Sequence, residues 1–209
     1  MNTCLKIPGL LLLCALGIST LGCSEDPGIR HYKEPRVAGD TKKAEAPGKA
    51  FVPEAGSLIR YLNAIVPTPD GRSYFVKLMG PPEDLAKIEP AFTKFIQSLK
   101  FPKEAGKSLT WEAPENWTTG PENQMRIATL RIPSGEKKLE LTITLFGGDL
   151  KANIDRWRME LGLPELGAIG DAEYQKTVKE MTVDGSKVYI VDMQGIKKPG
   201  GMAPPFMKQ

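Results

Sequence analysis

Apolar and polar positions alternate along three stretches of the chain, and this pattern predicts β-strands with one buried face. The clearest stretch is 139–145, where every odd position is leucine or isoleucine and every even position is threonine or glutamate. Residues 125–132 and 73–79 alternate in the same way. In 73–79 the two faces separate Tyr74, Val76 and Leu78 from Phe75, Lys77 and Met79.

A helical period of apolar residues marks two further stretches. Residues 82–99 carry one apolar stripe after Gly-Pro-Pro-Glu-Asp, a composition that suits the first turn of a helix. Pro90 lies inside this stripe and removes one backbone hydrogen bond, so we expect a kink or two abutting segments. The second helix is expected over 150–161, with Asp149 as its N-cap.

The remaining segments complete an α+β pattern. Residues 57–66 fit either a helical stripe or a strand buried on both faces, and the turn residues at 67–71 favour the strand. Residues 109–117 are expected to form a short strand, and Asp184-Gly185 predicts a hairpin near the C-terminus. This order predicts a mostly antiparallel sheet of about six to seven strands covered by two helices. After the second helix we expect a loop that holds one helical turn.

The N-terminus has the layout of a secretory signal. Lys6 precedes an apolar run over 7–18, which is shorter than the roughly 20 residues that a membrane-spanning helix needs. We therefore expect residues 1–22 to be a signal peptide, 23–56 a flexible tether, 57–195 one α+β domain and 196–209 a loose tail rich in proline and glycine. An uncleaved anchor or an ordinary secretory signal is the alternative, and either one exports the domain.

Leu21-Gly22-Cys23 resembles the lipobox of bacterial lipoproteins, with Thr20 and Leu21 in nearly the reverse of the usual order. The resemblance implies that Cys23 is diacylated and becomes the new N-terminus, which anchors the domain to a membrane. The other two cysteines, Cys4 and Cys14, lie in the segment expected to be removed, so no disulfide and no cysteine-based zinc site is expected in the domain.

Six blocks of the domain carry a resemblance, at residues 74–81, 91–101, 111–117, 125–129, 153–158 and 161–164. These blocks resemble uncharacterised envelope lipoproteins of planctomycete-type bacteria, and the order of elements is more distantly similar to PsbP-type α/β/α sandwiches. The resemblance to the PsbP type implies an extrinsic domain that binds partner proteins, and neither family supplies catalytic residues.

The sequence lacks the residue sets that most catalytic mechanisms use. The single histidine, His31, falls in the expected tether, so no Ser-His or Cys-His catalytic set and no histidine metal site is expected. No phosphate-binding glycine loop is present, and the acidic residues are scattered. The net charge of +3 is too small to indicate a nucleic-acid-binding domain. We therefore expect no cofactor, no metal and no nucleic-acid partner.

Two features suggest binding. Arg156 and Arg158 flank Trp157 on the second helix, and arginine suits bidentate contacts with carboxylates and phosphates. Trp111 and Trp117 offer either core packing or an aromatic platform for sugars. The sequence thus predicts a lipid-anchored, non-catalytic domain of the cell envelope with an envelope protein as partner. A glycan-binding module or a weak carboxylate-dependent hydrolase is the alternative.

Overall fold

Seven antiparallel strands form one sheet, and three helices pack against it, in a computed structural model that describes residues 49–102, 108–121, 124–168 and 170–199. The α+β class and the antiparallel sheet predicted from the sequence are confirmed. The described residues all belong to one compact unit that spans 45–209. The signal segment, Cys23 and His31 lie outside the described residues.

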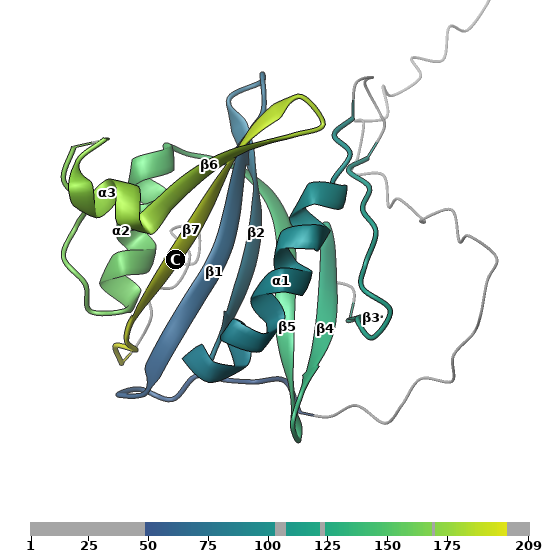
Figure 1. The fold of residues 1–209 in the computed structure, drawn as a ribbon, viewed down its shortest axis with the longest axis vertical. Helices are drawn as coiled ribbons and strands as arrows, with labels where there is room; N and C mark the ends of the chain where they lie inside the picture. The colour runs from purple at the N-terminus through teal and green to yellow at the C-terminus, as the bar shows by residue number, and fades with distance from the viewer. Residues whose placement is uncertain (1–48, 103–107, 122–123, 169, 200–209) are drawn as a thin grey trace, which may run out of the picture. The chain divides into compact units, whose positions relative to one another are not determined.

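The strands follow the order β3-β4-β5-β2-β1-β7-β6 across the sheet, and every pairing is antiparallel (Figure 1). Their bounds are β1 Leu58–Pro67, β2 Arg72–Gly80, β3 Thr118–Thr119, β4 Ala128–Ser134, β5 Lys137–Gly147, β6 Val178–Val183 and β7 Ser186–Ile196.

The segment 57–66, which the sequence left between helix and strand, is the interior strand β1. It pairs with β2 on one side and β7 on the other, and its residues 61–66 are all buried. The hairpin between β6 and β7 turns at Asp184 and Gly185, whose φ angles of 49° and 79° are both left-handed. This conformation is the one that an Asp-Gly hairpin turn adopts.

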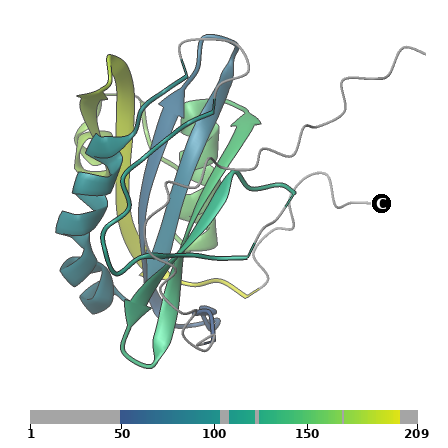
Figure 2. The ribbon, with the colours of Figure 1, turned by 90° about the vertical axis from the view of Figure 1, so that its right-hand side faces the viewer.

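The helices lie on both faces of the sheet. Helix α1 spans Pro82–Ser98, α2 spans Leu150–Glu160 and α3 spans Ala172–Thr177. Figure 2 shows α1 to one side of the strands, with α2 seen behind them. The expected two helices are present, and the single turn expected after the second one is α3. Asp149 caps α2 as predicted, because its side chain accepts a hydrogen bond from the Ala152 backbone N–H at 2.9 Å.

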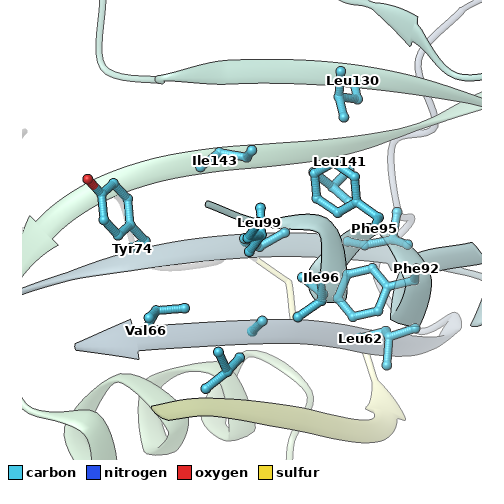
Figure 3. Packing of buried hydrophobic residues seen from close by; sticks show 14 of the residues in the cluster. Leu62, Val66, Tyr74, Phe92, Phe95, Ile96, Leu99, Leu130, Leu141 and Ile143 are labelled. Carbon is cyan, nitrogen blue, oxygen red and sulfur yellow. The ribbon is translucent and has the colours of Figure 1, made fainter. Parts of the chain in front are cut away.

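The α1 face of the sheet is apolar across six strands. Side chains of α1 project between side chains from β1, β2, β4 and β5, and Val183 and Val188 extend this core to β6 and β7 (Figure 3). The largest of the α1 side chains, Phe92 and Phe95, are 1% and 0% exposed. Burial on this scale accounts for most of the stability of such a layer.

The opposite face is apolar only in part. Trp157 of α2 is fully buried, and its ring meets Phe75 edge-on with 6.1 Å between the centroids. The core around it draws on β1, β2, β6, β7, α2 and α3, and includes no buried residue from β4 or β5. The positions of those two strands beside this core are mostly polar and include Thr129, Arg131, Glu140, Thr142 and Thr144.

Three expectations need correction. Helix α1 continues through Pro90 as one helix and is not divided into two abutting segments. The proline lies on the exposed side, where the lost backbone bond leaves a carbonyl facing water. Residues 109–117 do not form a strand. Their only described β pairing is an isolated bridge between Lys100 and Thr110. The segment then turns at residues 115–116 and leads into the two-residue β3.

The ends of the domain also differ from the expected boundaries. Phe51, placed in the tether by sequence, packs against both cores, and its N–H donates to the Lys138 carbonyl at 2.8 Å. Gly56 is held in the same way by the carbonyl of Lys197. Phe51 and Gly56 therefore pack and bond with the sheet domain, and β7 continues through Ile196 into a hydrogen-bonded segment.

Candidate functional site

A row of polar residues crosses the α2 face where its apolar core ends. Thr129 of β4 pairs with Thr142 of β5, Thr142 pairs with Lys77 of β2, and Lys77 pairs with Asn63 of β1. Because directly paired residues project from the same face, these four side chains lie side by side across four strands. Lys77 stands at the boundary, with the apolar core toward Asn63 and the polar strands toward Thr142.

Lys77 has aromatic neighbours but no anionic contact. Its Nζ lies 5.2 Å from the centre of the Trp157 ring and 5.7 Å from that of Tyr61. Within the described part of the chain, no carboxylate forms an ion pair with it. Cation–π contacts of this kind contribute about 0.5–2 kcal/mol, depending on desolvation.

The surroundings of Lys77 disfavour its charged form. Burial lowers the pKa of its ammonium below the ordinary 10.5, and the positive charges of Arg156, Lys197 and Arg126 lower it further. Glu160 raises this pKa in part. The Glu160 carboxylate is itself shared, since it accepts a hydrogen bond from the Tyr61 hydroxyl at 2.7 Å and lies 3.7 Å from the Lys197 ammonium.

Helix α2 brings two more N–H donors to this boundary. Arg156 is half-buried, and its Nη2 donates to the Asn153 Oδ1 at 3.0 Å, while its Nε is buried without an acceptor. The next residue, Trp157, is fully buried, and its Nε1 also lacks an acceptor. Buried polar groups are nearly always hydrogen-bonded, so neighbouring exceptions call for an explanation.

Strand β4 and the segment before it supply two guanidinium groups that share one acid. Glu140 lies 3.6 Å from Arg126 and 3.8 Å from Arg131. Arg126 also donates to the Thr129 hydroxyl at 3.3 Å. The buried Nε of Arg131, the atom 3.8 Å from Glu140, forms no hydrogen bond with any described residue. The Glu140 carboxylate is therefore the shared ion-pair partner of both guanidinium groups.

We name Lys77, Arg126, Arg131, Glu140 and Arg156 the Lys77 cluster. Its four cations and one carboxylate leave an excess of positive charge, and three arginine or indole nitrogens on or beside it form no hydrogen bond with a described residue. The unpartnered nitrogens are the Nε atoms of Arg131 and Arg156 and the indole Nε1 of Trp157. Such an arrangement has the charge and the hydrogen-bonding capacity to bind an anion.

No protein-family model, no curated protein and no solved structure matches this chain. The site must therefore be interpreted from its own chemistry. Among residues 49–102, 108–121, 124–168 and 170–199, no group of three or more histidine, cysteine or acidic residues could hold a metal ion. In the same ranges, no helix has both the length and the apolar character to cross a bilayer.

The structure separates the two arginines that the sequence singled out. Arg158 is 3% exposed and projects to the side of α2 that faces α3. It donates to the carbonyl of Pro164 at 2.6 Å and to the Thr177 hydroxyl at 3.3 Å, and it pairs with Glu173 at 3.3 Å. These contacts fix the α2–α3 connection. Arg156, in contrast, belongs to the Lys77 cluster.

The two tryptophans lie together on the other face of the sheet, around Phe95 of α1. Trp117 is 7% exposed, with its ring centroid 5.4 Å from that of Phe95, and Trp111 is half-buried at 6.3 Å. A shallow depression of about 500 Å³ lies beside them, lined by residues of α1 and by 112–114, but neither indole lines it. The pair therefore packs mainly against the α1 core.

Sequence reasoning missed Lys77 as a site residue. A signal was available, since Lys77 is a lysine at an inward position of an otherwise apolar strand. That signal did not show which strand would lie beside β2 or which edge of α2 would reach it. Arg126 and Arg131 were missed for the same reason, because their shared acid lies on β5.

Proposed function

We propose that this protein is an exported, lipid-anchored and non-catalytic domain of the cell envelope, and that the Lys77 cluster binds an envelope protein with an acidic surface. The observation that carries the binding role is the excess of cations with unpartnered nitrogens on the polar part of the α2 face. Fixed, partly desolvated arginines are the residues that proteins use to recognise carboxylates.

The two faces of the sheet differ in a way that supports this assignment. The α1 face carries a continuous apolar core to which six strands contribute. On the α2 face, the half-buried side chains of Arg131, Glu140 and Thr142 stand beside the apolar core. A partner that docks there meets a positive potential next to fixed backbone, which favours specific encounter.

The anchoring role rests on the Leu21-Gly22-Cys23 motif and the apolar run before it. Two acyl chains on one N-terminal cysteine hold a protein stably at a bilayer, whereas one chain does so only marginally. The resemblance to envelope lipoproteins of planctomycete-type bacteria agrees with this placement.

Intact-mass analysis of the protein from native membranes is expected to give a chain that begins at diacylated Cys23. Replacing this residue, Cys23→Ser, is expected to remove the lipid mass and to release the protein from the membrane fraction. An unmodified mature chain, or a lipid mass that survives the substitution, would contradict the anchor. The binding role is not affected by that result, because it depends on residues of the folded domain.

Charge reversal at Arg156 tests the binding role. In cells, the Arg156→Glu protein is expected to lose at least about tenfold of its cross-linking to an envelope partner, since one fixed cation becomes a repulsive charge. The matched control is Lys179→Glu, on the exposed side of β6 and away from the cluster. Cross-linking that falls equally in both variants, or in neither, would refute the proposal.

Two assays on the purified, unmodified chain test the alternative functions. A purified chain that turns over an ester, peptide or glycoside, with a rate that titrates with one carboxylate, would favour the weak hydrolase. Binding of a glycan that shifts tryptophan fluorescence, and is lost in Trp111→Ala, would favour the glycan-binding module.

A further inference from the structure

The described chain enters and leaves the sheet at the same end. Leu58, the first residue of β1, pairs directly with Ile196, the last residue of β7. The Gly56 N–H donates to the Lys197 carbonyl at 2.8 Å, and the Lys197 N–H donates to the Ser57 carbonyl at 2.9 Å. The turn between β4 and β5 also lies at this end, the lower one in Figure 1. We name residues 49–58, 136–138 and 195–199 the entry end.

Large apolar side chains of the entry end face solvent. Leu58 and Ile196 are 49% and 50% exposed, and Val52 is exposed still further. Because directly paired residues project from one face of a sheet, Leu58 and Ile196 form one continuous apolar surface. Exposed apolar side chains that lie together, unlike single scattered ones, indicate a surface that contacts something else.

A groove lies beside this apolar pair. Its volume is about 520 Å³, and its lining includes Ile196, Leu161, Leu163 and Pro199. A Cβ at Gly195 would collide with the carbonyl of Leu161, so the end of β7 and the end of α2 lie in close contact there. The groove is therefore built into the fold, and it leaves room for an acyl chain next to Ile196.

Lysine is in excess at the entry end. Its charged residues are Lys49, Lys137, Lys138, Lys197, Lys198, Glu54 and Glu136. Lys197 pairs with Glu160 at 3.7 Å, but no carboxylate of the described residues forms an ion pair with the other four lysines. Lysines that lie beside apolar residues suit a bilayer surface with anionic lipids, since its negative potential attracts them.

The place of the entry end along the chain favours a membrane as its partner over a soluble protein. In the proposed function the lipid is on Cys23, and residues 24–48, 25 in all, separate it from Lys49. A flexible chain of 25 residues spans about 25–30 Å, which keeps the entry end near the bilayer. Because the contact is then intramolecular, a weak affinity for the surface is enough to maintain it.

We propose that the entry end docks on an anionic membrane surface. Val52, Leu58 and Ile196 meet the boundary between headgroups and acyl chains, and Lys49 and Lys198 face the lipid phosphates. The inference rests on the proposed lipid anchor and deepens it, because it assigns the end of the sheet that faces the bilayer.

Quenching of a tryptophan by brominated lipids tests the docking. The reporter is Leu58→Trp in the full chain from native membranes, reconstituted in vesicles of equal parts phosphatidylcholine and phosphatidylglycerol. We expect acyl-chain bromines to quench this tryptophan. The matched control is Ile127→Trp, an exposed position level with Ile65 and about 20 Å along the strands from Leu58, which should not be quenched. Val52→Trp is the second reporter if Leu58→Trp does not fold.

Two further substitutions, each made with the reporter, separate the charged and apolar contributions. Lys198→Gln is expected to lower the ratio of docked to free chain about fivefold, the effect of removing one lysine from an anionic surface. Ile196→Asp is expected to abolish quenching, because it places a carboxylate at the acyl boundary. Lys179→Gln on β6 is the matched control and should leave quenching unchanged.

The absence of quenching at the reporter would overturn the docking. Equal quenching at the Ile127→Trp position, or in vesicles of phosphatidylcholine alone, would do the same. If the intact mass shows a lipid on Cys23 but the reporter is not quenched, the anchor stands and only the docking fails. If Cys23 carries no lipid, the anchor fails, and the mature chain is mixed with the same vesicles. Quenching of the reporter then supports the docking by itself, and its absence refutes it.

Discussion

Replacing Trp157 with alanine is expected to lower the free energy of unfolding by about 3–5 kcal/mol, the usual cost of removing a fully buried tryptophan. Trp157 is 0% exposed and is the largest fully buried side chain of the domain. It packs edge-on against Phe75 of β2 and joins α2 to the sheet. The cost includes both the lost transfer free energy and the cavity that remains between α2 and the strands.

The matched control is Met159→Ala on the same helix. Met159 is 43% exposed, so this substitution should change stability by less than about 0.5 kcal/mol. Equilibrium denaturation followed by circular dichroism compares the two variants without relying on the tryptophan signal. A loss below about 1 kcal/mol in Trp157→Ala would show that α2 does not pack on the sheet as described.

Replacing Arg158 with methionine is expected to cost about 3 kcal/mol, because it removes charge-assisted hydrogen bonds and leaves their partners buried. Arg158 is 3% exposed and donates to the Pro164 carbonyl and the Thr177 hydroxyl. Glu173, its third partner, is 55% exposed by side chain and can turn to solvent, so it adds little. The loss falls on the segment that connects α2 to α3.

Arg156→Gln is the natural control, since it changes the other arginine beside Trp157. Arg156 has one described hydrogen bond, to Asn153, and no ion pair with any described acid, so its loss should cost less than about 1 kcal/mol. The melting temperatures of the two variants check this difference. Equal destabilisation would mean that both arginines are structural and would weaken the assignment of Arg156 to a binding face.

The periods and turns of the sequence determined most of the fold. Alternation in 73–79 and 139–145 is a local signal, and the two-residue period assigns each side chain to a face without any knowledge of the partner strand. The Asp-Gly turn is local in the same sense. The prediction of a strand over 109–117 was wrong. The two tryptophans gave this segment a strand-like composition, but an irregular backbone can also bury them against Phe95.

The sequence by itself also determined which chemistries lack their residues, and it pointed to Arg156 and Arg158 as a pair. Only the tertiary structure showed that the two arginines lie in different surroundings. Neighbouring positions on a helix lie about 100° apart, so residues 156 and 158 project to opposite sides of Trp157. Which side meets Lys77 and which meets α3 depends on how α2 lies on the sheet, and long-range packing sets that orientation. The Lys77 cluster likewise arises in part from strand register, because β2, β4 and β5 bring Lys77, Arg131 and Glu140 onto one face although they are distant in the sequence.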